Sequence, residues 1–200
     1  MDINDILERI NAVPLRDKRR IVAIVGAPAS GKSTLAQALA KRIPNACVLP
    51  MDGFHRNNDD LERHGLLKRK GAPETFDAVG FVEAIKSMRK SENFDFPTFD
   101  RTHDCVVPSG GCLTATDETI LVEGNYLLID AEPWVELASE WDFTIMLEVS
   151  LEVLQERLVD RWVHNGHDAA GALARAKRND LPNAQLVISN SLPAELVIVA

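Results

Sequence analysis

The chain has 200 residues, of which 22 are Lys or Arg and 30 are Asp or Glu, so its formal charge is −8. This length fits a single domain whose core needs no disulfide or metal to be stable. The acidic balance argues against general nucleic-acid binding, because such binding depends on cations that neutralise phosphates.

Three features of the sequence concern the location of the protein. The first residues lack the basic and apolar regions of a signal peptide. No apolar stretch approaches the roughly 20 residues of a membrane span. The three cysteines are an odd number, which indicates reduced thiols rather than a disulfide framework. We therefore expect a cytoplasmic protein without membrane insertion.

The hydrophobic pattern predicts strands that alternate with helices. Apolar residues at helical spacing predict an N-terminal amphipathic helix within residues 1–19. Apolar runs predict buried strands at residues 21–25, 47–49, 119–122, 143–147 and 196–199. The other predicted helices occupy residues 32–43, 78–90 (with Asp77 as N-cap), 151–163 and 169–180. This alternation predicts a three-layer α/β fold, with a mostly parallel five-stranded sheet between helices on both faces.

One segment interrupts the alternation of strands and helices. Residues 104–116 contain the β-prone pair Val106 and Val107, followed by Pro-Ser-Gly-Gly at residues 108–111. This pattern predicts a β-hairpin with its turn at residues 108–111, or a flexible loop.

The strongest motif lies between the first predicted strand and the helix that follows it. Residues 26–34 match G-x-x-x-x-G-K-[ST], in which glycines let backbone N–H groups surround phosphate oxygens at a helix N-terminus. Lys32 is expected to reach the β- and γ-phosphates, and the Ser33 hydroxyl to bind Mg²⁺. The motif predicts a P-loop NTPase fold that binds ATP and Mg²⁺. The residues expected to contact the nucleotide are Gly26, Ala27, Pro28, Ala29, Ser30, Gly31, Lys32, Ser33 and Thr34.

Two acidic residues come directly after predicted strands. Asp52 follows the strand at 47–49, where a carboxylate can accept the proton of an attacking hydroxyl and can also contribute to a Mg²⁺ site. An Asp-Gly turn is the alternative interpretation of Asp52. Glu123 follows the strand at 119–122 and is expected to hold Mg²⁺ or to accept a hydrogen bond from substrate, with a solvent-facing acid as the alternative.

Arg157 and Arg161 are four residues apart on a predicted helix and therefore lie on one face of it. Two guanidinium groups there could close over a triphosphate and neutralise charge in the transition state. Spacing alone favours a salt-bridged surface instead, because acidic residues lie beside both arginines. Further along, Trp162 is expected to be a packing residue. Arg175 is expected to lie on a solvated face, with a place in the nucleotide site as the alternative.

Taken in order, these segments resemble the uridine kinase, phosphoribulokinase and pantothenate kinase family of P-loop kinases over residues 20–200. Residues 51–54 resemble its D-G-F segment, and Arg-Lys-Gly-Ala-Pro-Glu-Thr-Phe-Asp at residues 69–77 resembles a stretch of the bacterial pantothenate kinases. Residues 97–100 resemble its P-x-[YF]-D stretch, and residues 157–161 resemble its arginine-bearing lid helix. Within the family, the chain is most similar to small bacterial kinases associated with sugar transport, including fructose transport system kinases.

The resemblance implies a kinase that phosphorylates a hydroxyl group of a small-molecule acceptor. We expect catalysis from Asp52, Lys32, Arg157 and Arg161. The expected acceptor-binding residues are Asp52, Phe54, His55, Arg69, Phe99, Asp100, Arg101, His103 and Glu123. Residues 101–104 depart from the uridine kinase pattern, and residues 94–96 depart from the pantothenate kinase pattern. A sugar, a nucleoside and a pantothenate-like acceptor therefore all stay open.

We expect one kinase domain over residues 1–200, with an acceptor-pocket hairpin region at 94–117 and a lid region at 151–181. The main alternative is a nucleotide-binding regulator, or a transport-associated ATPase that hydrolyses ATP without an acceptor. A kinase releases ADP only with its acceptor, whereas a regulator responds to a protein partner. Because two-fold dimers are the commonest oligomers, a homodimer is the expected assembly.

Overall fold

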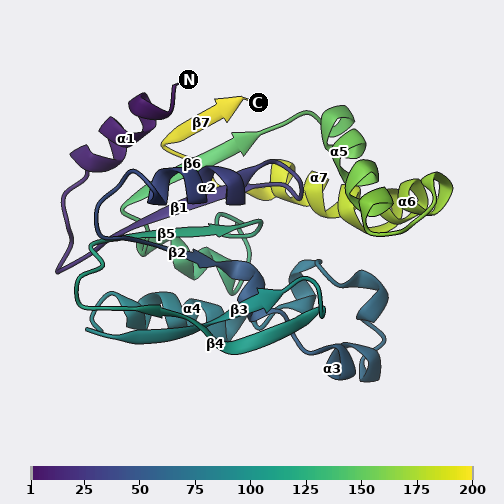
Figure 1. Ribbon diagram of the computed structural model, residues 1–200, viewed down its shortest axis with the longest axis horizontal. Helices are drawn as coiled ribbons and strands as arrows, with labels where there is room; N and C mark the ends of the chain where they lie inside the picture. Colours follow the sequence, from purple (N-terminus) through teal and green to yellow (C-terminus); the bar gives the residue numbers. More distant parts are fainter. Residues whose placement is uncertain (1, 200) are drawn as a thin grey trace.

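The computed structural model describes residues 2–199 of the chain. The strands of its main sheet are β1 (Arg20–Gly26), β2 (Ala46–Pro50), β5 (Thr119–Gly124), β6 (Phe143–Glu148) and β7 (Leu196–Val199). They are all parallel and lie in the order β2-β5-β1-β6-β7 (Figure 1). A separate antiparallel pair consists of β3 (Phe94–Asp100) and β4 (Cys105–Leu113). The predicted α/β fold with a five-stranded parallel sheet is confirmed.

Seven α-helices surround the sheet in the described part of the chain. They are α1 (Ile3–Ala12), α2 (Lys32–Ala40), α3 (Asn58–Arg63), α4 (Ala78–Met88), α5 (Leu151–His164), α6 (Ala169–Arg175) and α7 (Leu181–Asn190). The Asp77 side chain accepts a hydrogen bond from the Gly80 N–H at 3.0 Å, which confirms the predicted N-cap of α4. Within residues 2–199, no helix has both the length and the apolar character that a bilayer crossing requires.

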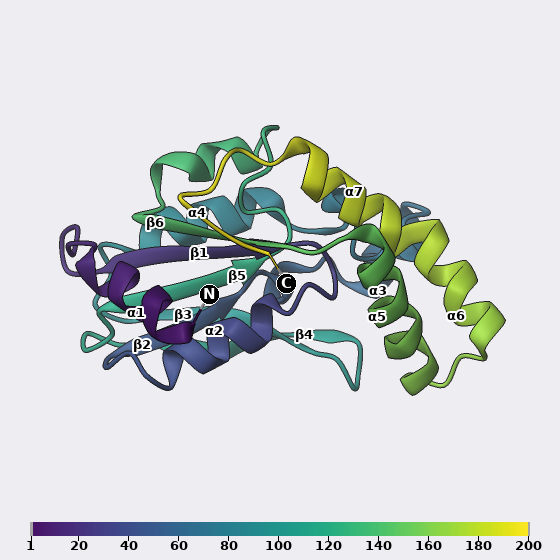
Figure 2. The same cartoon turned by 90° about the horizontal axis from the view of Figure 1, so that it is seen from above.

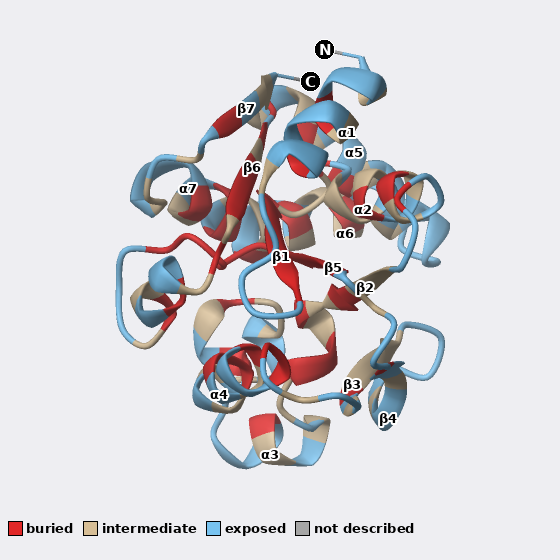
Figure 3. Cartoon of the chain, turned by 90° about the vertical axis from the view of Figure 1, so that its left-hand side faces the viewer, coloured by how far each residue is buried: buried red, intermediate tan, exposed pale blue. Residues whose placement is uncertain are grey.

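The core lies on both sides of β1, which is buried along its whole length (Figure 3). Successive side chains of a strand point to opposite faces. Ile21 and Val25 therefore pack in the cluster that includes α4, whereas Val22 and Ile24 pack in the cluster that includes α1 and α2. Figure 2 shows α1 and α2 on one side of the sheet, and α4 and α7 on the other.

Three neighbouring strands end at the same edge of the sheet. β5 lies between β1 and β2, and its Glu123 pairs with Ile24 of β1 and with Pro50 of β2. Ligands of parallel sheets bind beyond the carboxyl ends of the strands. The register therefore brings together the loop at residues 26–34, the carboxylate of Glu123 and the segment that contains Asp52.

The hairpin has a different turn from the predicted one. The turn between β3 and β4 lies at residues 101–104, whereas residues 108–111 run inside β4. The glycines of that segment allow β3 and β4 to lie close together, because a Cβ on Gly110 would lie 1.8 Å from Thr98 Oγ1. Glycine inside a strand often marks such a close approach, and the prediction of a turn there was wrong.

The last helices also differ from the predicted pattern. The helix predicted at 169–180 consists of α6 and a π-helical turn over Ala176–Asp180, and the chain then continues directly into α7. A π-turn shifts the side chains that follow it around the helix axis and is frequent at functional sites. In Figure 1, α5 and α6 project beyond the ends of the strands.

A buried arginine joins the end of α4 to the sheet. Arg89 is 5% exposed, and its Nη1 lies 2.9 Å from Asp142 Oδ2. The guanidinium also donates to the carbonyl oxygens of Arg19 at 3.2 Å and Glu140 at 2.5 Å. Asp142 Oδ2 accepts a further hydrogen bond from the Ile21 N–H at 2.7 Å. This network fixes α4 against the beginnings of β1 and β6.

Candidate active site

The loop between β1 and α2 has the shape of an anion cradle. Gly31 lies at φ +99° and Ala29 at φ +66°, a backbone region that side chains rarely adopt. A Cβ on Gly26 would lie 2.4 Å from Ser30 Oγ, so the backbone closes tightly at this point. The Ser30 hydroxyl is buried and has no hydrogen-bond partner among the described residues. These features fit a phosphate chain whose oxygens accept hydrogen bonds from the loop.

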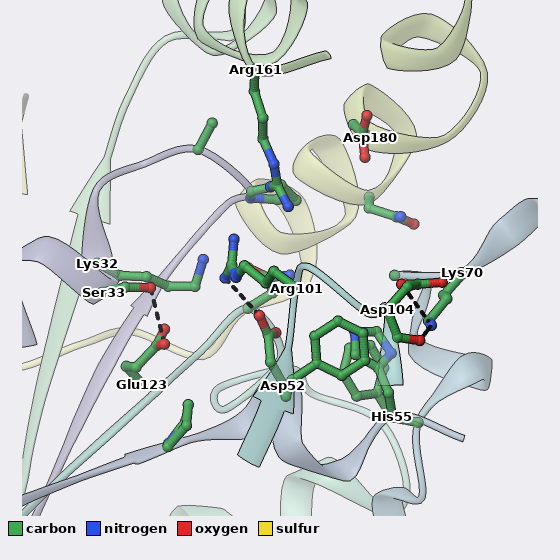
Figure 4. Close-up of a pocket in the computed structure, with 18 of the residues that line it drawn as sticks. Lys32, Ser33, Asp52, His55, Lys70, Arg101, Asp104, Glu123, Arg161 and Asp180 are labelled. Carbon is green, nitrogen blue, oxygen red and sulfur yellow. Dashed lines mark hydrogen bonds and ion pairs between the residues drawn. The ribbon is translucent and has the colours of Figure 1, made fainter. Parts of the chain in front are cut away.

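Lys32 and Ser33 lie at the start of α2, beside the end of β5. The Ser33 hydroxyl donates a hydrogen bond to Glu123 Oε1 at 2.9 Å (Figure 4). Lys32 Nζ lies 3.5 Å from the carbonyl oxygen of Ala27. Hydroxyl and carboxylate oxygens are the ligands that Mg²⁺ prefers, so Ser33 and Glu123 fit a Mg²⁺ ion next to bound phosphates.

Burial perturbs the two charged groups at this end of the pocket. It raises the pKa of Glu123, and the positive charge of Lys32 opposes that rise. Burial lowers the pKa of Lys32, and the negative charges of Glu123 and Asp52 oppose that fall. Each group therefore depends on its neighbours to stay ionised, as is typical of sites where charge is transferred.

Asp52 lies at the centre of the pocket (Figure 4). It belongs to a 3₁₀ turn, Met51–Phe54, directly after β2. Its Oδ2 accepts a hydrogen bond at 2.8 Å from Nη2 of Arg101, which stands on the turn between β3 and β4. A Cβ on Gly53 would lie 1.9 Å from the carbonyl oxygen of Pro97, so β3 rests directly on the turn that carries Asp52.

The pocket has a volume of about 610 Å³ and extends from Asp52 toward the hairpin. There the ring centroids of His55 and Phe99 are 4.9 Å apart, and Lys70 Nζ lies 4.8 Å from the Phe99 centroid. Lys70 forms an ion pair of 2.9 Å with Asp104 Oδ1. Burial lowers the pKa of His55 to about 4, so its imidazole is neutral near pH 7.

The helix α5 brings its two predicted arginines to the cradle. Arg157 Nη1 lies 3.5 Å from the carbonyl oxygens of both Ala29 and Ser30. Arg161, one turn further along, points into the pocket (Figure 4). Both arginines therefore lie on the side of α5 that faces the cradle and the pocket.

Trp162, Arg175 and Asp180 form a further wall of the pocket. The Trp162 indole N–H donates to Asp180 Oδ2 at 2.6 Å, and the Arg175 guanidinium lies 3.9 Å from the Trp162 ring. Burial raises the pKa of Asp180, whereas the hydrogen bond from Trp162 and the charge of Arg175 lower it. The sequence suggested a packing role for Trp162 and a solvated one for Arg175. Their place in the pocket comes from the way α5, α6 and the π-turn meet.

The predicted acceptor residues fall into two groups. Those that line the pocket are Asp52, His55, Phe99, Arg101 and Glu123. The other four lie outside it. Phe54 is buried in the core. Arg69 pairs with Glu74 at 2.5 Å. Asp100 Oδ2 lies 2.7 Å from His103 Nδ1 on the exposed hairpin turn.

Several lining residues were not among the predicted ones. They are Pro50, Lys70, Gly71, Phe76, Thr98, Asp104, Asn125, Trp162, Arg175, Asp180 and Asn183. Lys70 belongs to the stretch at 69–77 that carries the family resemblance, so that stretch was a signal for it. Gly71 and Phe76 belong to the same stretch. The others come from strands, turns, the lid region and α7, where no local pattern distinguishes a pocket residue from a surface residue.

The chain is similar to a family model, to curated proteins and to solved structures. The AAA domain family model matches residues 22–172. "Uncharacterized protein YggC" from Escherichia coli is 38% identical over 188 residues, which cover 90% of this chain and 78% of that protein. "Putative uridine kinase" from Schizosaccharomyces pombe is 31% identical over 195 residues, which cover 90% of this chain and 83% of that protein. A crystal structure of a "putative fructose transport system kinase" from Silicibacter sp. TM1040 superposes with a TM-score of 0.95, at 41% identity and 99% coverage of both chains.

Proposed function

Because the chain belongs to the AAA-domain P-loop proteins and, among them, to the kinases related to uridine kinase, phosphoribulokinase and pantothenate kinase, we propose that it transfers the γ-phosphoryl group of ATP to a hydroxyl group of a small metabolite. The phosphate cradle at residues 26–34 supports nucleotide binding. The 610 Å³ pocket next to it supports a small second substrate.

The position of Asp52 is the observation that carries this proposal. Its carboxylate stands between the phosphate cradle and the hairpin, in contact with Arg101 at 2.8 Å. In the proposed reaction Asp52 accepts the proton of the acceptor hydroxyl while the hydroxyl oxygen attacks the γ-phosphorus. The bond from the γ-phosphorus to the β–γ bridging oxygen breaks, and ADP leaves.

The remaining residues at the cradle have supporting roles in the proposal. Lys32 and the loop N–H groups hold the β- and γ-phosphates. Ser33 and Glu123, with Asp52 across the pocket, would hold Mg²⁺, which neutralises phosphate charge when it is bound. Arg161 reaches over the transferred group and stabilises the charge that develops on it.

Two regions complete the proposed arrangement. The hairpin region at 94–117 contributes Phe99 and Arg101 to the acceptor side of the pocket. The lid region at 151–181 contributes Arg161 and Trp162 from the opposite side. An acceptor between them would have its hydroxyl beside Asp52.

The test is release of ADP by the purified chain, measured with and without each member of a panel of sugars, nucleosides and pantothenate-like alcohols. We expect release to depend on one class of acceptor. With that acceptor, Asp52→Asn should lower kcat by about 10² or more and leave the Kd for ATP within about three-fold. Asp59→Asn, the same chemical change on the exposed face of α3, is the matched control and should behave as wild type.

Two results would contradict the proposal. ADP release at a constant rate with every metabolite would indicate the alternative function, a regulator or an ATPase without an acceptor. Unchanged turnover in Asp52→Asn would remove Asp52 from the chemistry, even if an acceptor had been found.

A further inference from the structure

On the basis of the proposed kinase function, we propose that the acceptor is an uncharged, hydroxyl-rich molecule, and that Asp104 is a specificity-determining residue that excludes phosphorylated and carboxylated acceptors. The juxtaposition that carries this proposal is the contact of Lys70 with Asn58 and Asp104, next to the unpartnered amide oxygen of Asn125 in the same pocket.

Lys70 is the lysine at the hairpin end of the pocket, and its donors are already in use. An ammonium group has three N–H donors. The Lys70 Nζ lies 2.6 Å from Asn58 Oδ1, 2.9 Å from Asp104 Oδ1 and 3.2 Å from the Asp104 carbonyl oxygen. Its side chain is only 11% exposed. No donor of Lys70 is left for a ligand in this arrangement.

The backbone of the hairpin turn supports this contact. Asp104 lies at φ +52°, a left-handed conformation that Asp tolerates better than most residues. Its second carboxylate oxygen accepts a hydrogen bond from Asn58 Nδ2 at 2.9 Å. Hydrogen bonds from Lys70 and Asn58 hold the pKa of Asp104 below its usual value, although burial opposes them. The turn therefore carries an ionised group that cancels the charge of Lys70.

The other cation on the hairpin side is occupied in the same way. Arg101 pairs with Asp52 at 2.8 Å. On the lid side, Arg175 stacks on Trp162, and Trp162 in turn donates to the acid Asp180. An additional anion bound at the hairpin end of the pocket would therefore be desolvated without an uncommitted positive charge beside it, which is strongly unfavourable. Among the described residues, the unpaired guanidinium groups of the pocket, Arg161 and Arg175, lie on the lid side instead.

Away from the lid, where the Arg175 Nε is a buried donor without a partner in the described part of the chain, the pocket has a buried hydrogen-bond acceptor that is free. Asn125 is 9% exposed, lines the pocket, and its Oδ1 has no partner among residues 2–199. His55 Nδ1 is likewise buried without a partner, and on a neutral imidazole it donates or accepts according to the tautomer. A buried acceptor atom gains most from a ligand that donates a hydrogen bond. Hydroxyl groups of a polyol supply such donors, whereas phosphate and carboxylate oxygens do not.

The first experiment compares matched pairs of acceptors with the wild-type chain. The pairs are ribose with ribose 5-phosphate, fructose with fructose 6-phosphate, glucitol with gluconate, and uridine with uridine 5′-monophosphate. We expect kcat/KM for acceptor-dependent ADP release to be at least about 10²-fold higher for the uncharged member of any pair that is used. A higher kcat/KM for the anionic member would overturn the proposal.

The second experiment changes the charge on the turn. Asp104→Asn keeps hydrogen-bonding atoms beside Lys70 but removes the negative charge. The ratio of kcat/KM for the anionic member to that for the uncharged member should rise at least about ten-fold, since a single uncovered charge is then available to the ligand. Asp59→Asn should leave the ratio unchanged. Equal ratios in Asp104→Asn and wild type, with matching thermal melts, would refute the role of Asp104.

A binding measurement separates this inference from the proposed function. Isothermal titration calorimetry of the same pairs, with a non-hydrolysable ATP analogue present, reports affinity without turnover. If no compound stimulates ADP release, the kinase proposal fails, and tighter binding of ribose or glucitol than of their anionic partners still supports an uncharged ligand. If anionic compounds bind more tightly or are phosphorylated faster, the inference on charge is wrong. The kinase proposal is then judged by ADP release alone.

Discussion

Replacing Gly53 with Ala would test the link between the hairpin and the proposed base. The new Cβ would lie 1.9 Å from the carbonyl oxygen and 2.5 Å from the carbonyl carbon of Pro97, and 3.0 Å from the Thr98 Cα. All three are backbone atoms, so no side chain can turn away. To reach the 3.4 Å of ordinary contact, β3 and the turn with Asp52 must separate by about 1.5 Å.

A displacement of this size should affect turnover more than stability. Misplacing a catalytic group by about 1 Å can lower the rate about 10²-fold. Overpacking of a buried site costs about 1–3 kcal/mol, which corresponds to a fall in Tm of roughly 2–12 °C for a chain of this length. The cradle is not touched, so the Kd for ATP should stay within about three-fold.

The assay is acceptor-dependent ADP release by Gly53→Ala, together with calorimetric ATP binding and a thermal melt. Gly65→Ala is the control, because a Cβ on Gly65 would meet nothing within 4 Å, although the residue lies at φ +69°. The backbone strain there costs about 1–2 kcal/mol, so this variant loses comparable stability while its kcat should stay near wild type. A Gly53→Ala protein with wild-type kcat would refute the claim that β3 fixes Asp52.

Three further changes have defined outcomes. Arg89→Met removes the buried cation of Asp142 and leaves the carboxylate paired only with the half-exposed Arg16, at 3.2 Å, so it should lower the free energy of unfolding by about 3 kcal/mol in urea titrations. The pKa of His55 falls from 6.5 to about 4 on folding, so the unfolded chain binds more protons in that interval. Stability should therefore be fully present above pH 6.5 and decrease as the pH falls toward 4, by about 3 kcal/mol at most. Lys32→Met should weaken ATP binding and lower kcat, because it removes the cation next to the proposed phosphate site.

Controls separate these outcomes from general effects. Lys18→Met removes an ion pair whose two side chains are 76% and 70% exposed, and should cost less than about 1 kcal/mol. His55→Gln should have a shallower fall of stability between pH 6.5 and 4 than the wild type. Equal slopes for the two proteins would contradict the assignment to His55, and undiminished ATP binding by Lys32→Met would contradict the proposed role of that lysine.

The parts of the fold that local pattern controls could be predicted from sequence. The apolar run of β1 and the glycine-rich loop after it have one combined signature, and the residues of the cradle lie where that signature puts them. The register of β5 between β1 and β2 is a tertiary fact, but Glu123 and Asp52 could be placed because parallel strands put their carboxyl ends at one edge.

Residues whose position depends on packing between distant segments could not be placed. The sequence predicts Gly110 as a turn residue, whereas in the structure its lack of a Cβ leaves room for the side chain of Thr98 on the opposite strand. Trp162 has an ordinary helical position, and only the π-turn after α6 brings Asp180 to its indole N–H. Neither contact has a periodic signal in the sequence.

Substitutions at the edge where β1, β2 and β5 end should have different consequences from substitutions in the hairpin. In the proposed function, phosphoryl transfer depends on three adjacent strand ends in a buried sheet, whereas the acceptor would be bound by a hairpin that pairs with no strand of that sheet. Substitutions in the hairpin can therefore alter which molecule is selected without moving the phosphate cradle. In a duplicated gene, substitutions in the hairpin alone are therefore expected to change the substrate, provided that Gly53 and the strand that lies on it are kept.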